Sequence, residues 1–298
     1  MIATGAAVAL TGPSACGSIR SGDAPAASRA STPLSVVASI FPLADVAQQV
    51  GGNAVRVEVL LPPGASPHGF EPKPTQAEWL AGADLLLTVG LEMDSWADRL
   101  AAASGRHDLR RVVLSSSADP KTIPGARSAM DPHIWLDPVA MKGFVFEVAT
   151  ALATLRPDSA AGIAARSAAY RAELDSLHLD YQVRLAAAPR RAFVTLHAAF
   201  HYMAARYGLQ QVAVFDSDMD EPGPGDLERV ARFVRTQGIG VILVQPELPL
   251  SSVTWLREQM GLRVLTLDDL GNPLLPGYDS YLAMMRTNLN ALVGALGE

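Results

Sequence analysis

The sequence predicts an α/β fold of two lobes, each a mostly parallel sheet flanked by helices, with one long rigid helix joining them. Short apolar runs alternate with amphipathic stretches from Leu34 onward, and this alternation is typical of βαβ units. It is interrupted once, because residues 158–187 show helical spacing and no strand pattern. The length of 298 residues also corresponds to about two domains, at roughly 150 residues for each.

Apolar runs of strand length fall into two sets, one on each side of this interruption. Most are rich in Val, Leu and Ile, which suit the buried strands of a parallel sheet. The first set covers residues 35–40, 55–60, 85–89 and 112–114, and the second covers 192–196, 212–215, 241–244 and 264–267. We therefore expect one sheet in each lobe.

Amphipathic stretches between these runs predict the flanking helices. They cover residues 43–50, 75–81, 94–102, 227–236 and 251–260. A further helix is predicted over 140–155, because Pro157 cannot continue a helical pattern that precedes it.

The stretch after Pro157 predicts the helix that links the lobes. Its apolar side chains keep helical spacing, and at 1.5 Å per residue the stretch would span roughly 45 Å, enough to cross a whole domain. These apolar residues are Ile163, Tyr170, Leu174, Leu177, Tyr181 and Leu185. We therefore expect an N-terminal lobe over 33–157, a linking helix over 158–188 and a C-terminal lobe over 189–298.

Composition excludes several classes of protein. The chain is 49% hydrophobic and 18% charged, which is typical of a globular protein rather than a disordered chain or a membrane bundle. Its 24 Lys and Arg against 30 Asp and Glu give a net charge of −6, so it lacks the basic field that nucleic-acid binding needs. The single cysteine, Cys16, excludes a disulfide scaffold and a multi-thiolate metal site.

The first 32 residues predict an export signal and a tether. Residues 2–10 are small and apolar and precede Cys16, which resembles a bacterial lipoprotein export signal in which the cysteine is lipidated. Pro13 and the absence of Lys or Arg before the apolar run depart from that pattern. The alternative is an ordinary signal cleaved after Ala24-Pro25-Ala26, and we favour the lipid anchor. Residues 18–32 are rich in Ser, Ala, Pro and Gly and read as a tether.

Four loop segments carry the side chains that could bind a ligand or a metal ion. They are residues 62–72 after a strand, 131–138 before a helix, 195–200 where a strand turns into a helix, and 267–271 after the last strand. Three of them follow the carboxyl end of a strand, where open α/β sheets place their ligands. Two come from each lobe, so their side chains could meet between the lobes. Imidazole nitrogens and carboxylate oxygens are ligands that Zn²⁺ accepts.

Within these segments the candidate ligands are histidines and one acid. Prolines flank His68 and His133, and a proline fixes the backbone that aims the ring. His197 lies at the third segment, and spacing alone does not separate Asp268 from Asp269, either of which could instead cap the turn that follows. Two other histidines, His107 and His178, are expected to be ordinary surface or hydrogen-bonded residues.

Together these segments resemble the zinc- and manganese-binding solute receptors of bacterial metal-ion ABC importers. The resemblance covers the whole mature chain and is carried by Pro67-His68 through Glu71-Pro72, the 131–138 block, the stretch 197–209 with Arg206-Tyr207-Gly208-Leu209, and 267–271, in this order around a long central helix.

The resemblance implies a metal held between the lobes by four residues, and it favours Asp268 over Asp269. Those residues are His68, His133, His197 and Asp268. It also implies a monomeric receptor outside the cytoplasm, at the cell surface or in the periplasm, anchored through a lipid on Cys16. Its cargo would be the metal ion and its partner an ABC importer permease subunit. No enzymatic activity is implied.

The donor set favours zinc over manganese. Three imidazoles and one carboxylate suit Zn²⁺, whereas Mn²⁺ prefers harder oxygen ligands. Manganese-preferring members of the family often place Glu where His197 stands, and some members carry an acid matching Ser66. Zinc receptors often carry a His-rich loop in the first lobe, and residues 115–130 contain no His. A manganese receptor of the same fold is therefore the alternative.

A zinc-dependent hydrolase is a less favoured alternative. His197 and His201 have the spacing of the H-E-x-x-H metalloprotease motif, but Ala198 stands where that motif has its glutamate base. Four protein ligands would also close the shell that a catalytic zinc keeps open. We expect His201 to lie on the helix face or beside the ligands. An adhesion protein, or a receptor for a chelated or organic ligand, is favoured less still.

Overall fold

The protein is described here by a computed structural model, which defines residues 1–3, 32–106, 108–118, 130–215, 223–246 and 251–297. The chain divides into two units, Met1–Thr32 and Pro33–Glu298, and the architecture below belongs to the second. The predicted lipidation site Cys16 and the loop residue His107 lie outside the described residues.

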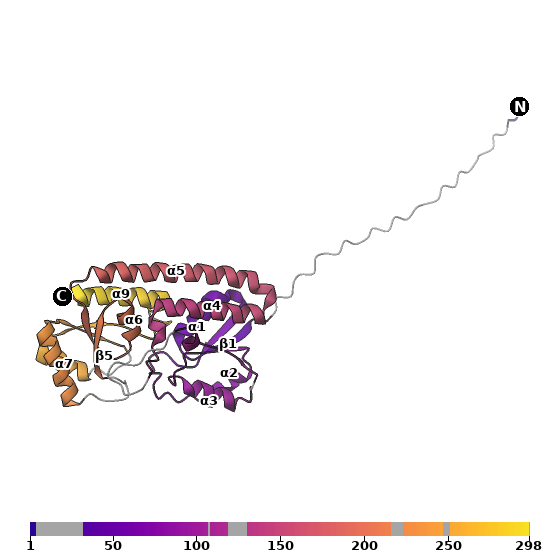
Figure 1. Cartoon of the computed structure of the whole chain (residues 1–298). Coiled ribbons are helices and arrows are strands. Elements are labelled where there is room, and N and C mark those ends of the chain that lie inside the picture. The colour runs from indigo at the N-terminus through magenta and orange to yellow at the C-terminus, as the bar shows by residue number, and fades with distance from the viewer. Residues whose placement is uncertain (4–31, 107, 119–129, 216–222, 247–250, 298) are drawn as a thin grey trace. The chain divides into compact units, whose positions relative to one another are not determined.

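The first sheet has four parallel strands in the order β2-β1-β3-β4. They are β1 (Leu34–Ala38), β2 (Val55–Val59), β3 (Leu85–Thr88) and β4 (Arg110–Val113). Helix α1 (Phe41–Gly51) packs on β1, β2 and β3, while α2 (Gln76–Ala81) and α3 (Ser95–Ala103) lie on the other side in Figure 1. Right-handed crossovers require this placement, because the connection from β1 to β2 and the connection from β2 to β3 run in opposite directions across the sheet.

The second sheet repeats this topology, with strand order β6-β5-β7-β8 and parallel pairing throughout. Its strands are β5 (Ala192–His197), β6 (Gln210–Phe215), β7 (Val241–Val244) and β8 (Arg263–Thr266). Helix α9 (Tyr281–Gly297) packs on β5, β7 and β8, whereas α6 (His201–Arg206) and α7 (Pro224–Gln237) contact β6, and α8 (Ser251–Met260) contacts α7. The two strand orders confirm the predicted fold class.

Two consecutive helices connect the sheets. In α4 (Pro138–Leu155), Asp137 caps the N-terminus by accepting the Val139 N–H at 3.0 Å, and Pro138 occupies the first turn. The 27-residue α5 (Ala160–Ala186) is about 40 Å long and runs across both halves of the molecule (Figure 1). By length and composition α4 could cross a membrane, but half of it is buried, as in the core helix of a globular protein.

Short 3₁₀ helices complete the described elements. They are η1 (Gly52–Ala54), η2 (Leu114–Ser117), η3 (Ile134–Leu136) and η4 (Pro157–Ser159). The last of these separates α4 from α5 at the proline that was predicted to end α4.

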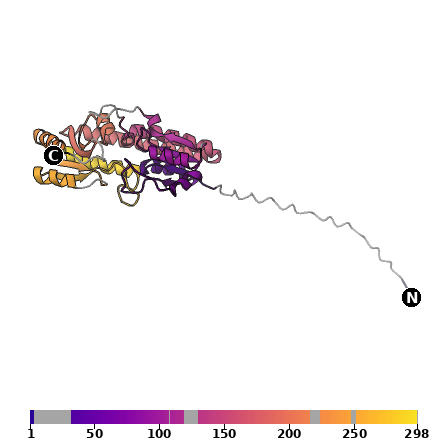
Figure 2. The same ribbon diagram turned by 90° about the horizontal axis from the view of Figure 1, so that it is seen from below.

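One apolar core extends through both halves, which Figure 2 shows side by side. It takes residues from β1, β3, α1 and α4, continues along α5, and reaches β7 and α9 of the second half. Along α5 the predicted apolar positions are buried, from Ile163 to Leu185. A smaller core lies on the other face of the second sheet, where Val194 and Ile242 pack with Val230 of α7.

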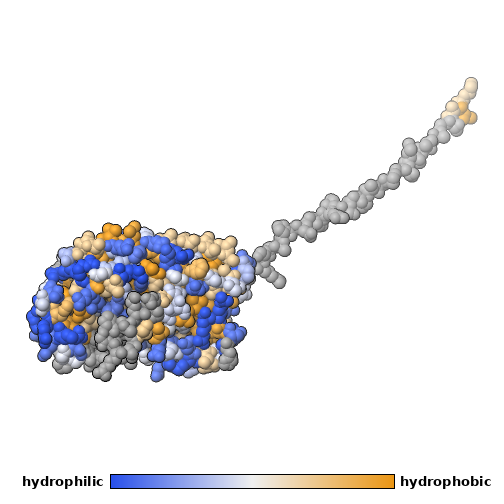
Figure 3. Space-filling view, viewed as in Figure 1, coloured by the Kyte–Doolittle hydropathy of each residue, from blue (hydrophilic) through white to orange (hydrophobic). Residues whose placement is uncertain are grey.

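The outer side of α5 carries apolar surface as well. In Figure 3 hydrophobic residues gather along the upper edge of the molecule, over this helix. Leu179 and Val183 lie one turn apart on α5 and are both exposed, while Leu177 and Tyr181 face the core.

Most element boundaries agree with the sequence prediction, and one helix was missed. All eight predicted strands form, and the first and last residue of each lie within two residues of the predicted positions. Helix α9 was not predicted, although Tyr281, Met285, Leu289 and Leu292 have helical spacing and are buried. Its pattern follows a long loop with no apolar run to mark where it begins.

Candidate metal centre

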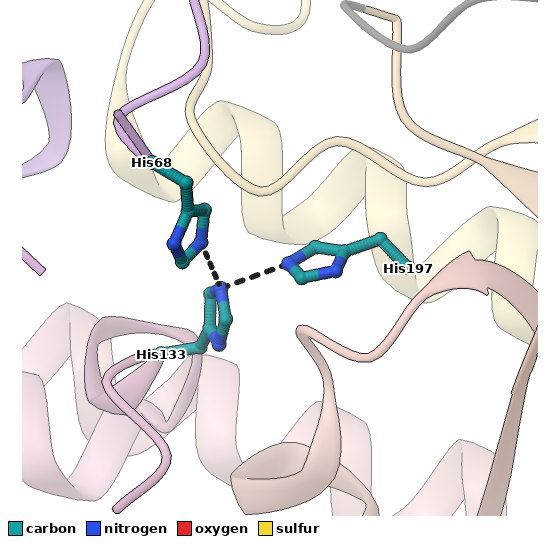
Figure 4. A group of neighbouring side chains, drawn as sticks. All are labelled: His68, His133 and His197. Carbon is teal, nitrogen blue, oxygen red and sulfur yellow. Dashed lines mark hydrogen bonds between the residues drawn. The ribbon is translucent and has the colours of Figure 1, made fainter. Parts of the chain in front are cut away.

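Three imidazole rings converge at one point between the two sheets (Figure 4). Nε2 of His133 lies 3.2 Å from Nε2 of His68 and 3.1 Å from Nε2 of His197. A ligand atom from each ring lies within 4.8 Å of the others. The segments that carry them are separated by 65 and 64 residues, so only the tertiary fold brings these nitrogens together.

This spacing fits a tetrahedral metal ion. Zn–N bonds of about 2.0–2.1 Å in a tetrahedron place the ligand nitrogens roughly 3.3 Å apart. The separations of 3.2 and 3.1 Å are close to that edge length, and ligand atoms of the third pair of rings lie within 4.8 Å. Two edges of a tetrahedron around a divalent cation are therefore already in place.

A buried carboxylate sets the proton on the central ring. Asp131 Oδ1 accepts the backbone N–H of His133 at 2.9 Å and lies 2.8 Å from its Nδ1. Burial alone would raise the pKa of Asp131, but hydrogen bonds from His133 and His201 lower the pKa below its usual range, so this carboxyl is ionised. An ionised carboxylate only accepts hydrogen bonds, so Nδ1 of His133 carries a proton and Nε2 is the nitrogen that faces the centre.

Helix α6 of the second half also contacts Asp131. Nδ1 of His201 lies 3.4 Å from Asp131 Oδ2, and the hydroxyl of Tyr202 donates to the Asp131 carbonyl at 2.8 Å. His201 is outside the group of converging rings and lies on helix α6 beside Asp131.

The second half positions His197 through its backbone. His197 is the last residue of β5, and its carbonyl accepts hydrogen bonds from Thr195 Oγ1 at 2.8 Å and Gln211 Nε2 at 3.0 Å. Gln211 Oε1 also accepts the N–H of Phe200, which fixes the turn that follows. Burial, with the nearby rings of His133 and His68, lowers the pKa of His197 to about 2, so its ring is neutral and can bind a metal.

The remaining candidate, Asp268, is buried at the carboxyl end of β8 but lies outside the group of converging rings. Its Oδ1 caps the following turn by accepting the N–H groups of Leu270 at 2.9 Å and Gly271 at 2.8 Å. Burial raises the pKa of this carboxyl. Asn288 of α9 holds the Asp268 main chain from both sides, accepting its N–H and donating to its carbonyl.

The neighbouring acid, Asp269, is also buried, and its carbonyl accepts the indole N–H of Trp135. The hydroxyl of Tyr281, at the start of α9, donates in turn to the Trp135 carbonyl at 2.7 Å. The segment after His133 is thus held against the loop and helix of the second half.

An ion pair adds a further contact between the halves. Asp137, which caps α4, accepts from Arg206 of α6 at both carboxylate oxygens. The hydrogen bond with Asp137 raises the pKa of Arg206. This pair lies between the segment that carries His133 and the helix that follows His197.

Sequence reasoning missed the residues that orient the three rings. Asp131 stands two residues before His133, and a carboxylate beside a ligating histidine is a recognisable signal. Gln211 and Asn288 have no such signal, because each is 11 or more residues away from the loop it holds. The histidine set aside on α5, His178, is hydrogen-bonded to Tyr207 at 3.0 Å, as expected.

Comparison with known proteins gives consistent relatives. Residues 36–295 match the profile of a family described as zinc-uptake complex component A, periplasmic. The zinc-binding lipoprotein AdcA of Streptococcus pneumoniae is 27% identical over 281 residues, which cover 87% of this chain and 55% of AdcA. The chain thus spans about half the length of the AdcA proteins it matches.

Two further relatives are matched over nearly their whole length. The manganese-binding lipoprotein MntA of Halalkalibacterium halodurans is 27% identical over 271 residues, covering 89% of this chain and 89% of MntA. The solved structure of the periplasmic zinc-binding protein TroA from Treponema pallidum superposes with a TM-score of 0.80 at 25% identity, covering 90% of this chain and 100% of TroA.

Proposed function

Because the chain belongs to the zinc-uptake complex component A family, we propose that it is an extracytoplasmic receptor that binds a divalent transition metal and delivers it to an ABC importer permease. The observation that carries the proposal is the convergence of three imidazole Nε2 atoms from segments remote in sequence. The family consists of transport receptors rather than enzymes, and Ala198 stands where a zinc hydrolase would need its glutamate base.

The proposed ligands are the three rings and one carboxylate. His68, His133 and His197 supply nitrogen, and Asp268 supplies the fourth ligand through Oδ2, since Oδ1 already caps the turn. A cation beside Asp268 would offset the desolvation of this buried carboxylate. Because Asp268 lies outside the group of rings, its ligation requires a shift of the loop or of the rings.

Paired asparagine variants test the choice between the two acids. Asp268→Asn should weaken zinc binding on the order of 100-fold, because loss of a group that only orients a ligand already costs about 10–100-fold and this change removes a ligand. Asp269→Asn serves as the matched control and should bind like the parent. Calorimetric titration of the metal-free proteins gives both affinities. Equal losses in the two variants, or a loss only in Asp269→Asn, would contradict the assignment.

Zinc is the proposed cargo. Three imidazoles and one carboxylate suit Zn²⁺, while the relatives include both zinc-binding and manganese-binding lipoproteins. The test is metal analysis of protein purified without a chelator, followed by competition between zinc and manganese. Because zinc binds nearly any such site more tightly than manganese, the metal content of the protein taken from its own cells decides the cargo.

The proposal extends to the rest of the chain. Residues 1–32 serve as export signal and tether with a lipid on Cys16, and the mature chain works as a monomer with lobes over 33–157 and 189–298 joined by the helix region 158–188. Incorporation of labelled fatty acid into the parent and not into Cys16→Ala tests the anchor. Co-purification with a membrane permease tests the partner.

A further inference from the structure

The segment that carries His68 has no regular secondary structure. Residues 62–75, between β2 and α2, form turns and extended chain only. His68 is half-buried, whereas His133 and His197 are 2% and 3% exposed. Because this segment contains no helix or strand, the orientation of the His68 ring depends on contacts that other side chains make with the segment.

One tryptophan makes two of these contacts. The indole N–H of Trp96, on α3, donates to the carbonyl of Pro67 at 3.1 Å. The same ring packs edge-on against Phe70, with centroids 4.9 Å apart. Trp96 is 3% exposed and Pro67 is buried, so the hydrogen bond is shielded from water. The indole thus contacts the residue before His68 and the residue two positions after it.

Asp94, the N-cap residue of α3, lies two residues before Trp96 and is itself held by hydrogen bonds. The buried carboxylate of Asp94 accepts the N–H of Val89 at 2.6 Å and the N–H of Gly90 at 3.0 Å. Leu91 and Glu92, which lie between Gly90 and Asp94, adopt positive φ angles of 54° and 66°. Residues other than glycine hold such angles only when the surrounding structure imposes them. This strained turn fixes the position from which Trp96 reaches the His68 segment.

We propose that Trp96 is a positioning residue of the metal site, which holds His68 in its binding orientation through the Pro67 carbonyl. The inference rests on the proposed function, since it concerns affinity for the metal. Partners that orient a metal ligand contribute 10–100-fold to affinity in other sites, and Trp96 acts in the same way through the main chain.

The test uses Trp96→Phe, which keeps an aromatic ring against Phe70 and removes the N–H donor. Zinc affinity of the metal-free protein, measured by competition with a chelating dye, should fall on the order of 10-fold. Trp79→Phe, at an exposed tryptophan of the same half, is the matched control and should bind like the parent. If Trp96→Phe fails to fold, benzothienylalanine at position 96 replaces it, because that side chain changes only the N–H to sulfur.

A double-mutant cycle separates positioning from general loss of structure. In a His68→Ala background, the change at Trp96 should have no further effect on zinc affinity, because the ring it positions is gone. The Co²⁺ spectrum of Trp96→Phe should shift toward that of His68→Ala. A change at Trp96 that weakens binding equally in both backgrounds, or leaves the parent affinity intact, overturns the inference. If the parent itself binds no metal, the proposed function fails instead.

Discussion

At the scale of single residues, the centre depends on histidine rings held in fixed orientations, one of which burial keeps neutral. His133 is the central ring, since its Nε2 lies within 3.2 Å of both neighbours. The Asp131 carboxylate holds its proton on Nδ1. His197 is neutral because burial, together with the nearby rings of His133 and His68, lowers its pKa. A metal ligand must be deprotonated, so the neutral ring of His197 suits the proposed site before any ion arrives.

His133→Ala should abolish most metal binding while the fold persists. Removing the central ring deletes a ligand, so zinc affinity should fall by at least about 100-fold, the upper range for loss of a mere orienting partner. Calorimetric titration measures this loss, and circular dichroism checks the fold. His178→Ala is the control, because His178 lies on α5 outside the group of converging rings and its ring contacts Tyr207, which follows α6. A His133→Ala protein that binds zinc like the parent would refute the ligand set.

The neutral state of His197 predicts a pH dependence of the metal-free protein. Its pKa is about 2 in the fold and about 6.5 in the unfolded chain. Between these values the unfolded chain binds the extra proton, so the free energy of unfolding falls as pH drops below about 6.5. The slope from this one group approaches about 1.4 kcal/mol per pH unit.

His197→Gln isolates that contribution. Urea unfolding of the metal-free parent and variant at pH 7.5 and pH 5 should show a larger loss of stability on acidification for the parent. Equal losses in the two proteins would mean that His197 takes up its proton in the folded state.

Sequence alone identified the three rings, because their segments adjoin strand ends or a helix start and two are flanked by proline. It did not identify the residues that orient the rings. Gln211 and Trp96 act on the main chain of segments far away in sequence, and nothing local in their own surroundings signals that role. Asp268 shows the same limit, since its spacing fits both a ligand and a turn cap, and the cap is what the fold displays.

At the scale of elements, the N-terminus of α4 and the C-terminus of α6 meet at an ion pair between the buried Asp137 and the exposed Arg206. Asp137 stabilises the N-terminus of α4 and also accepts from Arg206, the last residue of α6. A carboxylate at a helix N-terminus interacts favourably with the helix dipole, so the same group supports one helix and binds the other. The pair fixes the position of α4, which follows the His133 segment, relative to α6, which follows His197.

Arg206→Met should destabilise the protein by about 1.5–3 kcal/mol, because it removes hydrogen bonds to a buried charge while Asp137 stays in place. Arg206→Lys keeps the charge but cannot form both bonds, so it should lose less. Urea unfolding at pH 7 compares the three proteins. If Arg206→Met is as stable as the parent, the ion pair contributes nothing to the junction of the halves.

Element prediction succeeded where apolar periodicity was marked by clear boundaries. Pro157 ended α4 as predicted, and the eight strands are short apolar runs between polar segments. The missed helix, α9, carries Asn288, which holds the Asp268 loop. Its helical pattern was present in the sequence, but its role depends on contacts with the second sheet that only the tertiary structure supplies.

At the scale of the whole molecule, the two halves share α5, α9 and one apolar core. We therefore expect metal binding to stabilise the protein as one cooperative body. Zinc at about 100 times its dissociation constant should add about 2.7 kcal/mol, which raises the melting temperature by roughly 5–10 °C for a chain of this size. Thermal unfolding with zinc, manganese and chelator measures the effect.

The chelator should return the melting temperature to its metal-free value. Manganese at the same concentration should raise it less than zinc, in keeping with the order of intrinsic affinities. His133→Ala serves as the control and should show no rise with either ion. A parent protein whose melting temperature does not respond to zinc would count against binding at this centre.

The apolar core common to both halves also has a consequence for how an ion bound at the proposed site could leave. Separating the halves widely would expose that core to water, at about 25 cal/mol for each Å² of apolar surface. The least costly route for the ion to leave is therefore local, by displacement of the irregular chain around residue 68. Under the proposed function, a docked transporter would need to move only that short stretch to release the ion, while the remainder of the protein keeps its shape for the next round.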